Sequence, residues 1–228
     1  YFGMMMVEAG DADAFITGVY TKYDDAIKPA IEIVGMREGL NHIGGLNIVT
    51  SKLGTFFFAD TMVNNHPSKE TLIDIATLTH ETVKLFNTEP VMAMLSYSNF
   101  GERPIGSPAT VHEAVAHLHR NRPEILIDGE MQVNFALDKE LRHDKFPFSK
   151  IDGRNVNTLI FPNLSSSNIA YKLMLEIGMS ETIGPIQMGL RKPIHILDIE
   201  SSVREILNMI TIAVVDAQVE EQKAKLKA

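Results

Sequence analysis

Short apolar runs alternate along this chain with longer segments whose apolar residues recur at helical spacing. The short runs are bounded by glycine, proline or polar residues and predict buried β-strands. We place these strands at residues 14–17, 46–50, 55–59, 91–95, 125–127, 156–161 and 194–197. The longer segments predict helices, which we place at residues 24–34, 68–86, 109–119, 168–177 and 202–218. Residues 4–8 form the last part of an earlier helix.

Several helix ends carry their own chemical signals. Ser68 marks the start of the helix 68–86, because an N-cap serine accepts a hydrogen bond from an N–H group of the first turn. Ser202 and Glu205 have the Ser-x-x-Glu spacing of a capping box at the start of the last helix. Gly10 and Gly178 stand where a left-handed residue usually closes the last turn of a helix.

This alternation predicts an α/β fold with a mostly parallel sheet and helices on both of its faces. In such sheets, ligands bind outside the C-terminal ends of the strands. We therefore expect the loops at residues 96–101, 128–130 and 163–168 to line one rim of the sheet.

Composition narrows the classes of function. The 228 residues carry a formal net charge of −8 and no cluster of basic residues, which argues against nucleic-acid binding. The longest apolar segments, such as residues 206–215, fall well short of the roughly 20 residues that span a membrane, so we expect no membrane partner. The absence of cysteine excludes thiolate chemistry and is compatible with a reducing cytoplasm, where we place the protein.

The common catalytic motifs are missing. No Gly-x-Gly-x-x-Gly segment opens a helix after a strand, and no Gly-x-Ser-x-Gly elbow or His-Glu-x-x-His helix occurs. His117 and His119 are two residues apart on a predicted helix, so their side chains point to different faces. We therefore expect neither a dinucleotide site nor a metal site in this chain.

Two polar segments at strand ends remain as candidates. Ser165, Ser166 and Ser167 precede Asn168 at a predicted helix start, where free N–H groups bind phosphate-like anions. The same segment also suits an ordinary helix cap. The segment 128–130 is likewise compatible with a plain turn, and only its place on the predicted rim favours a site.

Four segments resemble, in the same order, those of phosphate acetyltransferases, which move an acetyl group between phosphate and coenzyme A. These segments are residues 96–98, 127–132, 160–164 and 168–173. The chain is more similar still to the acetyltransferase-like domain that follows the catalytic part of large bacterial NADP-dependent malic enzymes. The shared segments are residues 58–61, 98–101, 128–132, 168–173 and 201–206.

The resemblance implies two αβα lobes, of the isocitrate/isopropylmalate dehydrogenase-like type, with the active site in the cleft between them. We assign residues 1–66 and 198–228 to the first lobe and residues 67–197 to the second. The chain opens with Tyr1-Phe2-Gly3, which resembles a helix inside the first lobe of the family. We therefore expect a fragment whose first lobe is incomplete at its N-terminus.

The resemblance also implies a site for acetyl-CoA or coenzyme A. Its expected contacts are Thr21, Ser98, Asp128, Gln132, Asn168 and Lys172. Asp198 and Ile199 stand where the family has a Ser-Arg pair that grips phosphate, and Glu205 replaces the aspartate that serves as general base. Glu205 is accordingly the one catalytic candidate, although its place in the capping box explains it without catalysis. NADP and a divalent metal would belong only to the attached catalytic region.

Three functions remain open at this point. The first is a regulatory domain that binds acetyl-CoA as an allosteric effector of an attached malic enzyme catalytic domain. The second is an active phosphate acetyltransferase with Glu205 as its base. The third is mainly a dimerisation domain, because the resemblance implies a homodimer or higher homo-oligomer and the apolar helix 202–218 could pack at an interface.

Overall fold

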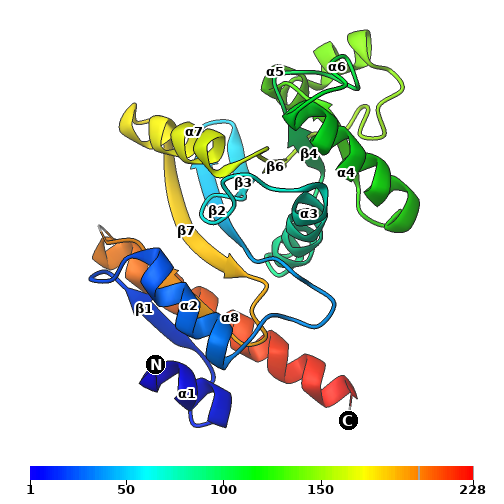
Figure 1. Cartoon of the computed structure of the whole chain (residues 1–228). Helices are drawn as coiled ribbons and strands as arrows, with labels where there is room; N and C mark the ends of the chain where they lie inside the picture. Colours follow the sequence, from blue (N-terminus) through cyan, green and yellow to red (C-terminus); the bar gives the residue numbers. More distant parts are fainter. Residues whose placement is uncertain (200, 228) are drawn as a thin grey trace.

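A computed structural model describes residues 1–199 and 201–227 of the chain. Within these ranges, helices and strands alternate for most of the length (Figure 1). The strands are β1 (Phe15–Gly18), β2 (Gly44–Ser51), β3 (Gly54–Ala59), β4 (Met92–Leu95), β5 (Ile127–Met131), β6 (Thr158–Ile160), β7 (Ser180–Met188) and β8 (Ile194–Leu197). The helices are α1 (Phe2–Ala9), α2 (Tyr23–Ile33), α3 (Lys69–Lys84), α4 (Ser107–Asn121), α5 (Val133–Leu137), α6 (Lys139–Lys145), α7 (Leu164–Glu176) and α8 (Val203–Lys227).

The strands form two separate sheets. The larger sheet has six strands in the order β5-β4-β6-β3-β2-β7, and the smaller one pairs β1 with β8. The pairs β1–β8, β3–β6, β4–β5 and β4–β6 are parallel, whereas β2 runs antiparallel to both of its neighbours. The α/β class and the mostly parallel sheet are thus confirmed.

Helices cover both faces of the six-stranded sheet because its strands place apolar residues alternately on each face. In β3, Phe57 packs into the cluster under α3 and α4, whereas Phe58 packs into the cluster on the opposite face, which includes Tyr171 of α7. In β4, Met92 likewise packs into the cluster under α3 and α4, and Ala93 packs into the cluster on the opposite face. A sheet buried on both faces needs nearly continuous apolar strands, and the sequence supplies them.

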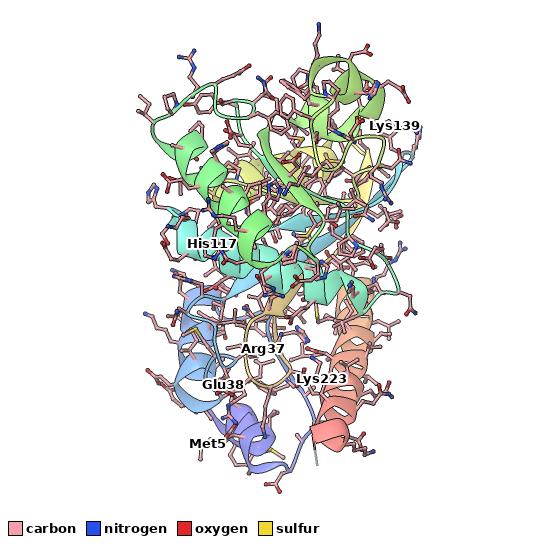
Figure 2. The ribbon with its side chains drawn as sticks, turned by 90° about the vertical axis from the view of Figure 1, so that its right-hand side faces the viewer. Met5, Arg37, Glu38, His117, Lys139 and Lys223 are labelled. Carbon is pink, nitrogen blue, oxygen red and sulfur yellow. The ribbon has the colours of Figure 1, made fainter. Side chains whose placement is uncertain are left out.

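The two-stranded sheet is also enclosed by helices. Ile194 and Ile196 of β8 pack with Ala30 of α2 and Met4 of α1, and α8 contacts β1, β8 and β7. In Figure 2, Met5 of α1 and Lys223 of α8 lie in the lower half, while helix α4 with His117 lies in the upper half.

The sheet pairing departs from the predicted lobe boundaries. Strands at 46–50 and 55–59 were assigned to the first lobe, but β2 and β3 pair with β7 and β6 in the six-stranded sheet. Strand β8 was assigned to the second lobe, but it pairs with β1. Apolar runs identify strands but not their partners, so these pairings could not be predicted from the sequence. The division into two lobes itself stays a prediction.

Helix boundaries gave a mixed outcome. Ser68 caps α3 by accepting a hydrogen bond from the N–H of Thr71, and Gly10 adopts φ 85°, as predicted. In contrast, α7 begins at Leu164 rather than at residue 168, because the Asn163 side chain caps it by accepting from the N–H of Ser166. Strand β7 and helices α5 and α6 were not predicted, because their segments lack a clear apolar period.

One buried cation holds the segment that contains α5 and α6. The guanidinium of Arg142 is fully buried and donates to the carbonyl oxygens of Phe135, Ala136, Ile151 and Arg154. We expect Arg142→Met to lower the free energy of unfolding by about 3 kcal/mol, because four carbonyls lose a charged donor.

Urea denaturation measures this loss, and Arg120→Met, at an exposed position on α4, is the matched control. Equal stability of the two variants would contradict a structural role for Arg142.

Candidate functional site

Two cavities that share part of their lining open between the six-stranded and the two-stranded sheet. The first, of about 260 Å³, lies between the start of α2, α7 and the end of β8. The second, of about 190 Å³, lies between α7, β7 and the start of α8. Both are lined by Asn47, Tyr171, Pro185 and Asp198, and we call the two together the intersheet cleft.

Four of the predicted site residues border this cleft. Thr21 and Asn168 line the first cavity, and Lys172 and Glu205 line the second. The four come from three parts of the chain that are far apart in the sequence, namely the segment before α2, helix α7 and helix α8. Among the predicted rim loops, 163–168 therefore reaches the cleft, although as the first turn of α7 rather than as a loop.

Ser98, Asp128 and Gln132 lie elsewhere, at the β4–β5 end of the six-stranded sheet (Figure 1). Asp128 was expected in a turn on the rim, but it lies inside β5 and is only 4% exposed. Its carboxylate accepts hydrogen bonds from Ser149 Oγ at 2.8 Å and from the N–H of Lys150 at 2.7 Å. The position of Asp128 is thus explained by holding the loop after α6 against β5.

Ser98 and Gln132 are likewise engaged within the protein. The Ser98 hydroxyl donates to the carboxylate of Glu130 at 3.3 Å, and the N–H of Gln132 donates to Asn99 Oδ1 at 3.0 Å. Glu130 is fully buried and also accepts from the N–H of Gly101. These contacts fix the connection between β4 and α4. The structure does not bring the seven predicted residues together in one cavity.

Glu205 forms the predicted capping box. Its carboxylate accepts a hydrogen bond from the N–H of Ser202 at 2.6 Å, while Ser202 Oγ accepts from the N–H of Glu205 at 3.3 Å. A carboxylate that caps a helix in this way is held at one orientation at the edge of the cleft. Its catalytic role stays a prediction.

Carboxylates dominate the electrostatics of the cleft. Burial, with the nearby charges of Asp198 and Glu205, raises the pKa of Tyr171 to about 12. Lys172 lies with its Nζ 6.0 Å from the centre of the Tyr171 ring. Lys22, at the opposite edge of the cleft, is exposed to solvent. The cleft therefore has acidic walls and cations only at its outer edge among its described lining residues.

The loop after β3 carries part of the floor of the cleft, and a buried carboxylate fixes it. Asp60 is 3% exposed and accepts hydrogen bonds from the N–H groups of Gly45, Met62, Val63 and Asn64. This places the side chain of Thr61, which precedes Met62, at the cleft. Residues 58–61 carry part of the family resemblance. No role was predicted for Thr61, Asn47 or Tyr171, because none of them belongs to a motif of known chemistry.

A buried chain of polar groups starts at one wall of the cleft and crosses between the sheets. Tyr23 Oη donates to Gln187 Oε1 at 2.6 Å, and the N–H of Gln187 donates to His195 Nδ1 at 3.3 Å. His195 Nε2 then lies 3.5 Å from a carboxylate oxygen of Asp216 on α8. The chain thus connects α2, β7, β8 and α8.

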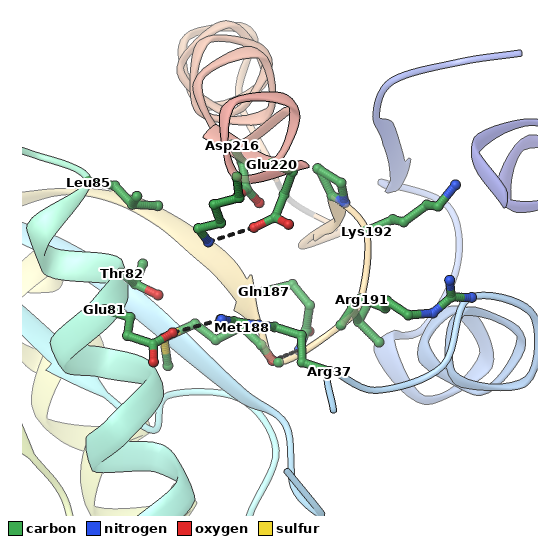
Figure 3. A pocket seen from close by; sticks show the side chains of 14 residues that line it. Arg37, Glu81, Thr82, Leu85, Gln187, Met188, Arg191, Lys192, Asp216 and Glu220 are labelled. Atoms are coloured by element: carbon green, nitrogen blue, oxygen red, sulfur yellow. Dashed lines mark hydrogen bonds and ion pairs between the residues drawn. The ribbon is translucent and has the colours of Figure 1, made fainter. Parts of the chain in front are cut away.

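Two further cavities lie beside α8. Figure 3 shows the more polar one, where Arg37 pairs with Glu81 at 2.8 Å and Lys223 pairs with Glu220 at 2.7 Å. At about 50 Å³ it is too small for a metabolite. The other, of about 220 Å³, is mostly apolar and lies between α3, β7 and α8. In the part of the chain that the structure describes, no three acidic or histidine side chains gather closely enough to hold a metal ion.

Comparison with known proteins shows the family to which the chain belongs. Residues 1–214 match the sequence profile of the phosphate acetyl/butaryl transferases. The chain belongs to this family. A phosphate acetyltransferase from Clostridium acetobutylicum is 36% identical over 225 residues, which cover 96% of this chain and 67% of that protein.

In other relatives, the matching region is only one part of a much longer protein. The NADP-dependent malic enzyme of Escherichia coli is 39% identical over 218 residues, which cover 95% of this chain. The match covers only 28% of that malic enzyme, so the chain spans little more than a quarter of its length. The Clostridium acetyltransferase, in contrast, is matched over 67% of its length.

A solved structure shows the same fold. A phosphotransacetylase from Streptococcus pyogenes superimposes with a TM-score of 0.88 at 33% identity, over 97% of this chain and 67% of that one. Separately, none of the helices in the described ranges combines the length and the hydropathy needed to cross a bilayer.

The raised pKa of Tyr171 gives a test of the acidic cleft. The folded-state pKa of about 12 exceeds the ordinary value of 10.0, so folding favours the neutral phenol. This contribution to stability is complete below pH 10 and is lost as the pH rises through 12. We expect the tyrosinate absorbance of the wild type minus that of Tyr171→Phe to rise near pH 12.

Asp198→Asn removes one of the negative charges that raise the pKa of Tyr171. The rise in the tyrosinate absorbance difference should therefore occur at lower pH in this variant. A Tyr171 step at the ordinary value in the wild type would refute the acidic surroundings.

Proposed function

We propose that this chain is an acetyltransferase-like regulatory domain that binds acetyl-CoA in the intersheet cleft and turns it over slowly or not at all. The observation that carries the proposal is the carboxylate of Asp198 in the lining of both cavities. The family resemblance puts a Ser-Arg pair at positions 198 and 199, where this chain has Asp198 and Ile199.

The substitution at these positions changes what the cleft can hold. An arginine donates two parallel hydrogen bonds to a phosphoryl group, so its loss removes the strongest contact with that anion. A carboxylate at the same edge repels the anion as well. A thioester is neutral at its acyl end, so the change disfavours acetyl phosphate more than acetyl-CoA. The nucleotide end of acetyl-CoA can still reach Lys22 and Lys172 at the outer edge of the cleft.

We further propose that the domain regulates an attached NADP-dependent malic enzyme, which oxidises and decarboxylates malate to pyruvate. The Escherichia coli relative of that name, in which this chain matches only 28% of the length, supports the proposal. Binding regulates only if acetyl-CoA prefers one conformation of the assembled enzyme, and the coupling is then reciprocal. NADP and a divalent metal would bind the catalytic region alone. The absence of cysteine agrees with placement in the cytoplasm.

Two alternatives have specific support. An active phosphate acetyltransferase is favoured by the Clostridium relative and by Glu205 at the edge of the cleft. A dimerisation domain is favoured by α8, on which four exposed apolar side chains recur at helical spacing. These side chains are Val203, Leu207, Ile210 and Val214.

Calorimetry and a turnover assay on the same preparation separate the three readings. We expect this chain to bind acetyl-CoA with one set of sites and to form no thioester from coenzyme A and acetyl phosphate. The physical reason is that the cleft is present, whereas the arginine that would bind the phosphoryl group is replaced by Ile199. Turnover that is lost in Glu205→Gln would establish the active enzyme instead. No heat with acetyl-CoA, together with a stable dimer in sedimentation, would establish the dimerisation domain.

Restoring the family pair tests the role assigned to Asp198. We expect Asp198→Ser combined with Ile199→Arg to raise the affinity for inorganic phosphate at least about tenfold, since one charged hydrogen bond contributes roughly 1.5–3 kcal/mol. Titration calorimetry with inorganic phosphate measures the change. Asp13→Ser combined with Ala12→Arg makes the same change of charge in the loop before β1 and is the control. Equal gains in both variants would mean that overall charge, not the cleft, governs anion binding.

A further inference from the structure

A buried hydroxyl at the floor of the cleft has no partner. Thr61 lines the first cavity and is 2% exposed, and its Oγ1 makes no hydrogen bond to any described residue. Burying a hydroxyl without a partner is costly, and most buried polar groups in proteins are therefore paired. Valine has the same shape and would avoid that cost. Because this hydroxyl also lines a cavity, a bound ligand can supply the missing partner.

Hydrogen bonds hold the backbone on both sides of Thr61. Asp60, the residue before it, accepts hydrogen bonds from the N–H groups of Gly45, Met62 and Asn64. These bonds anchor the loop to the start of β2 and fix both neighbours of Thr61 along the chain. The side chain of Thr61 is held at the cleft as a consequence.

A second polar side chain shares this position. Asn47 of β2 is 4% exposed and lines both cavities. Gly184 of β7 makes room for it, since a Cβ at that position would collide with Asn47 Oδ1. The cleft therefore contains two uncharged hydrogen-bonding side chains, and the hydroxyl of Thr61 has no partner among the described residues.

The surroundings decide which chemical group fits these two side chains. The same cavity is lined by the apolar side chains of Met62, Leu164, Pro185 and Leu197. Asp198 lies on the same lining and disfavours an anion. Neutral donors beside a small apolar surface suit a carbonyl oxygen that carries a short alkyl group.

We propose that Thr61 Oγ1 and Asn47 Nδ2 donate hydrogen bonds to the carbonyl oxygen of a short acyl thioester, and so distinguish acetyl-CoA from free coenzyme A. This inference rests on the proposed function, because it assigns the acyl end of the same ligand. Thr61 and Asn47 are then specificity-determining residues that read the acyl group. The nucleotide end of the ligand would then extend toward the exposed Lys22 and Lys172 in the lining of the cleft.

Thr61→Val is the decisive variant, because it changes two properties in opposite directions. We expect acetyl-CoA to bind five- to tenfold more weakly by titration calorimetry, while the affinity for coenzyme A stays within a factor of two. We also expect the unliganded protein to gain a few degrees in Tm, since an unpaired buried hydroxyl is removed. Thr61→Ser keeps the hydroxyl and should retain the preference for acetyl-CoA.

Thr79→Val is the matched control. Thr79 of α3 is fully buried, and its Oγ1 also lacks a hydrogen-bond partner among the described residues, but it does not line the intersheet cleft. The control should gain stability without changing the affinity for either ligand.

The outcomes separate this inference from the function on which it rests. A wild type that binds neither acetyl-CoA nor coenzyme A overturns the proposed function and the inference with it. A wild type that binds both, with Thr61→Val weakening both ligands equally or neither, overturns only the acyl recognition. A selective loss of acetyl-CoA affinity together with a higher Tm supports it.

Discussion

The carboxylate of Asp60 holds together the part of the structure on which the cleft depends. It is buried where β3 ends, and it accepts hydrogen bonds from the start of β2 and from the backbone of the loop that leads to α3. A carboxylate that accepts several N–H bonds is well stabilised despite its burial. Without this carboxylate, the loop at the floor of the cleft would lose the hydrogen bonds by which it is joined to the start of β2 through Asp60.

Much of the fold follows from apolar patterning, because strands buried on both faces need continuous apolar residues. Phe57 and Phe58 show this directly, since they enter different cores on opposite faces of one sheet. What the pattern lacks is partner information. Strand β2 forms ladders with both β3 and β7, and β7 was missed altogether because Gly184, Pro185 and several polar residues interrupt its apolar run.

The site was predictable only in part, and for a related reason. Thr21, Asn168, Lys172 and Glu205 were expected from segments distant in sequence, and the structure brings them to one cleft. Asp128 was also expected there, but a short polar segment after a strand has the same appearance whether it ends the strand or continues it. Its partner Ser149, which explains the burial of Asp128, lies in a segment without any sequence signal.

The polar chain that starts at Tyr23 limits what one wall of the cleft can do. Burial and the charge of Asp60 raise the pKa of Tyr23, so its phenol keeps its proton, and that proton is already donated to Gln187. If Tyr23 donated this hydrogen bond to a ligand instead, the buried side-chain carbonyl of Gln187 would lose its hydrogen-bond donor, which is unfavourable. Tyr23 therefore shapes one wall of the cleft without donating a proton to a ligand. Behind it, His195 and Asp216 connect this wall to α8.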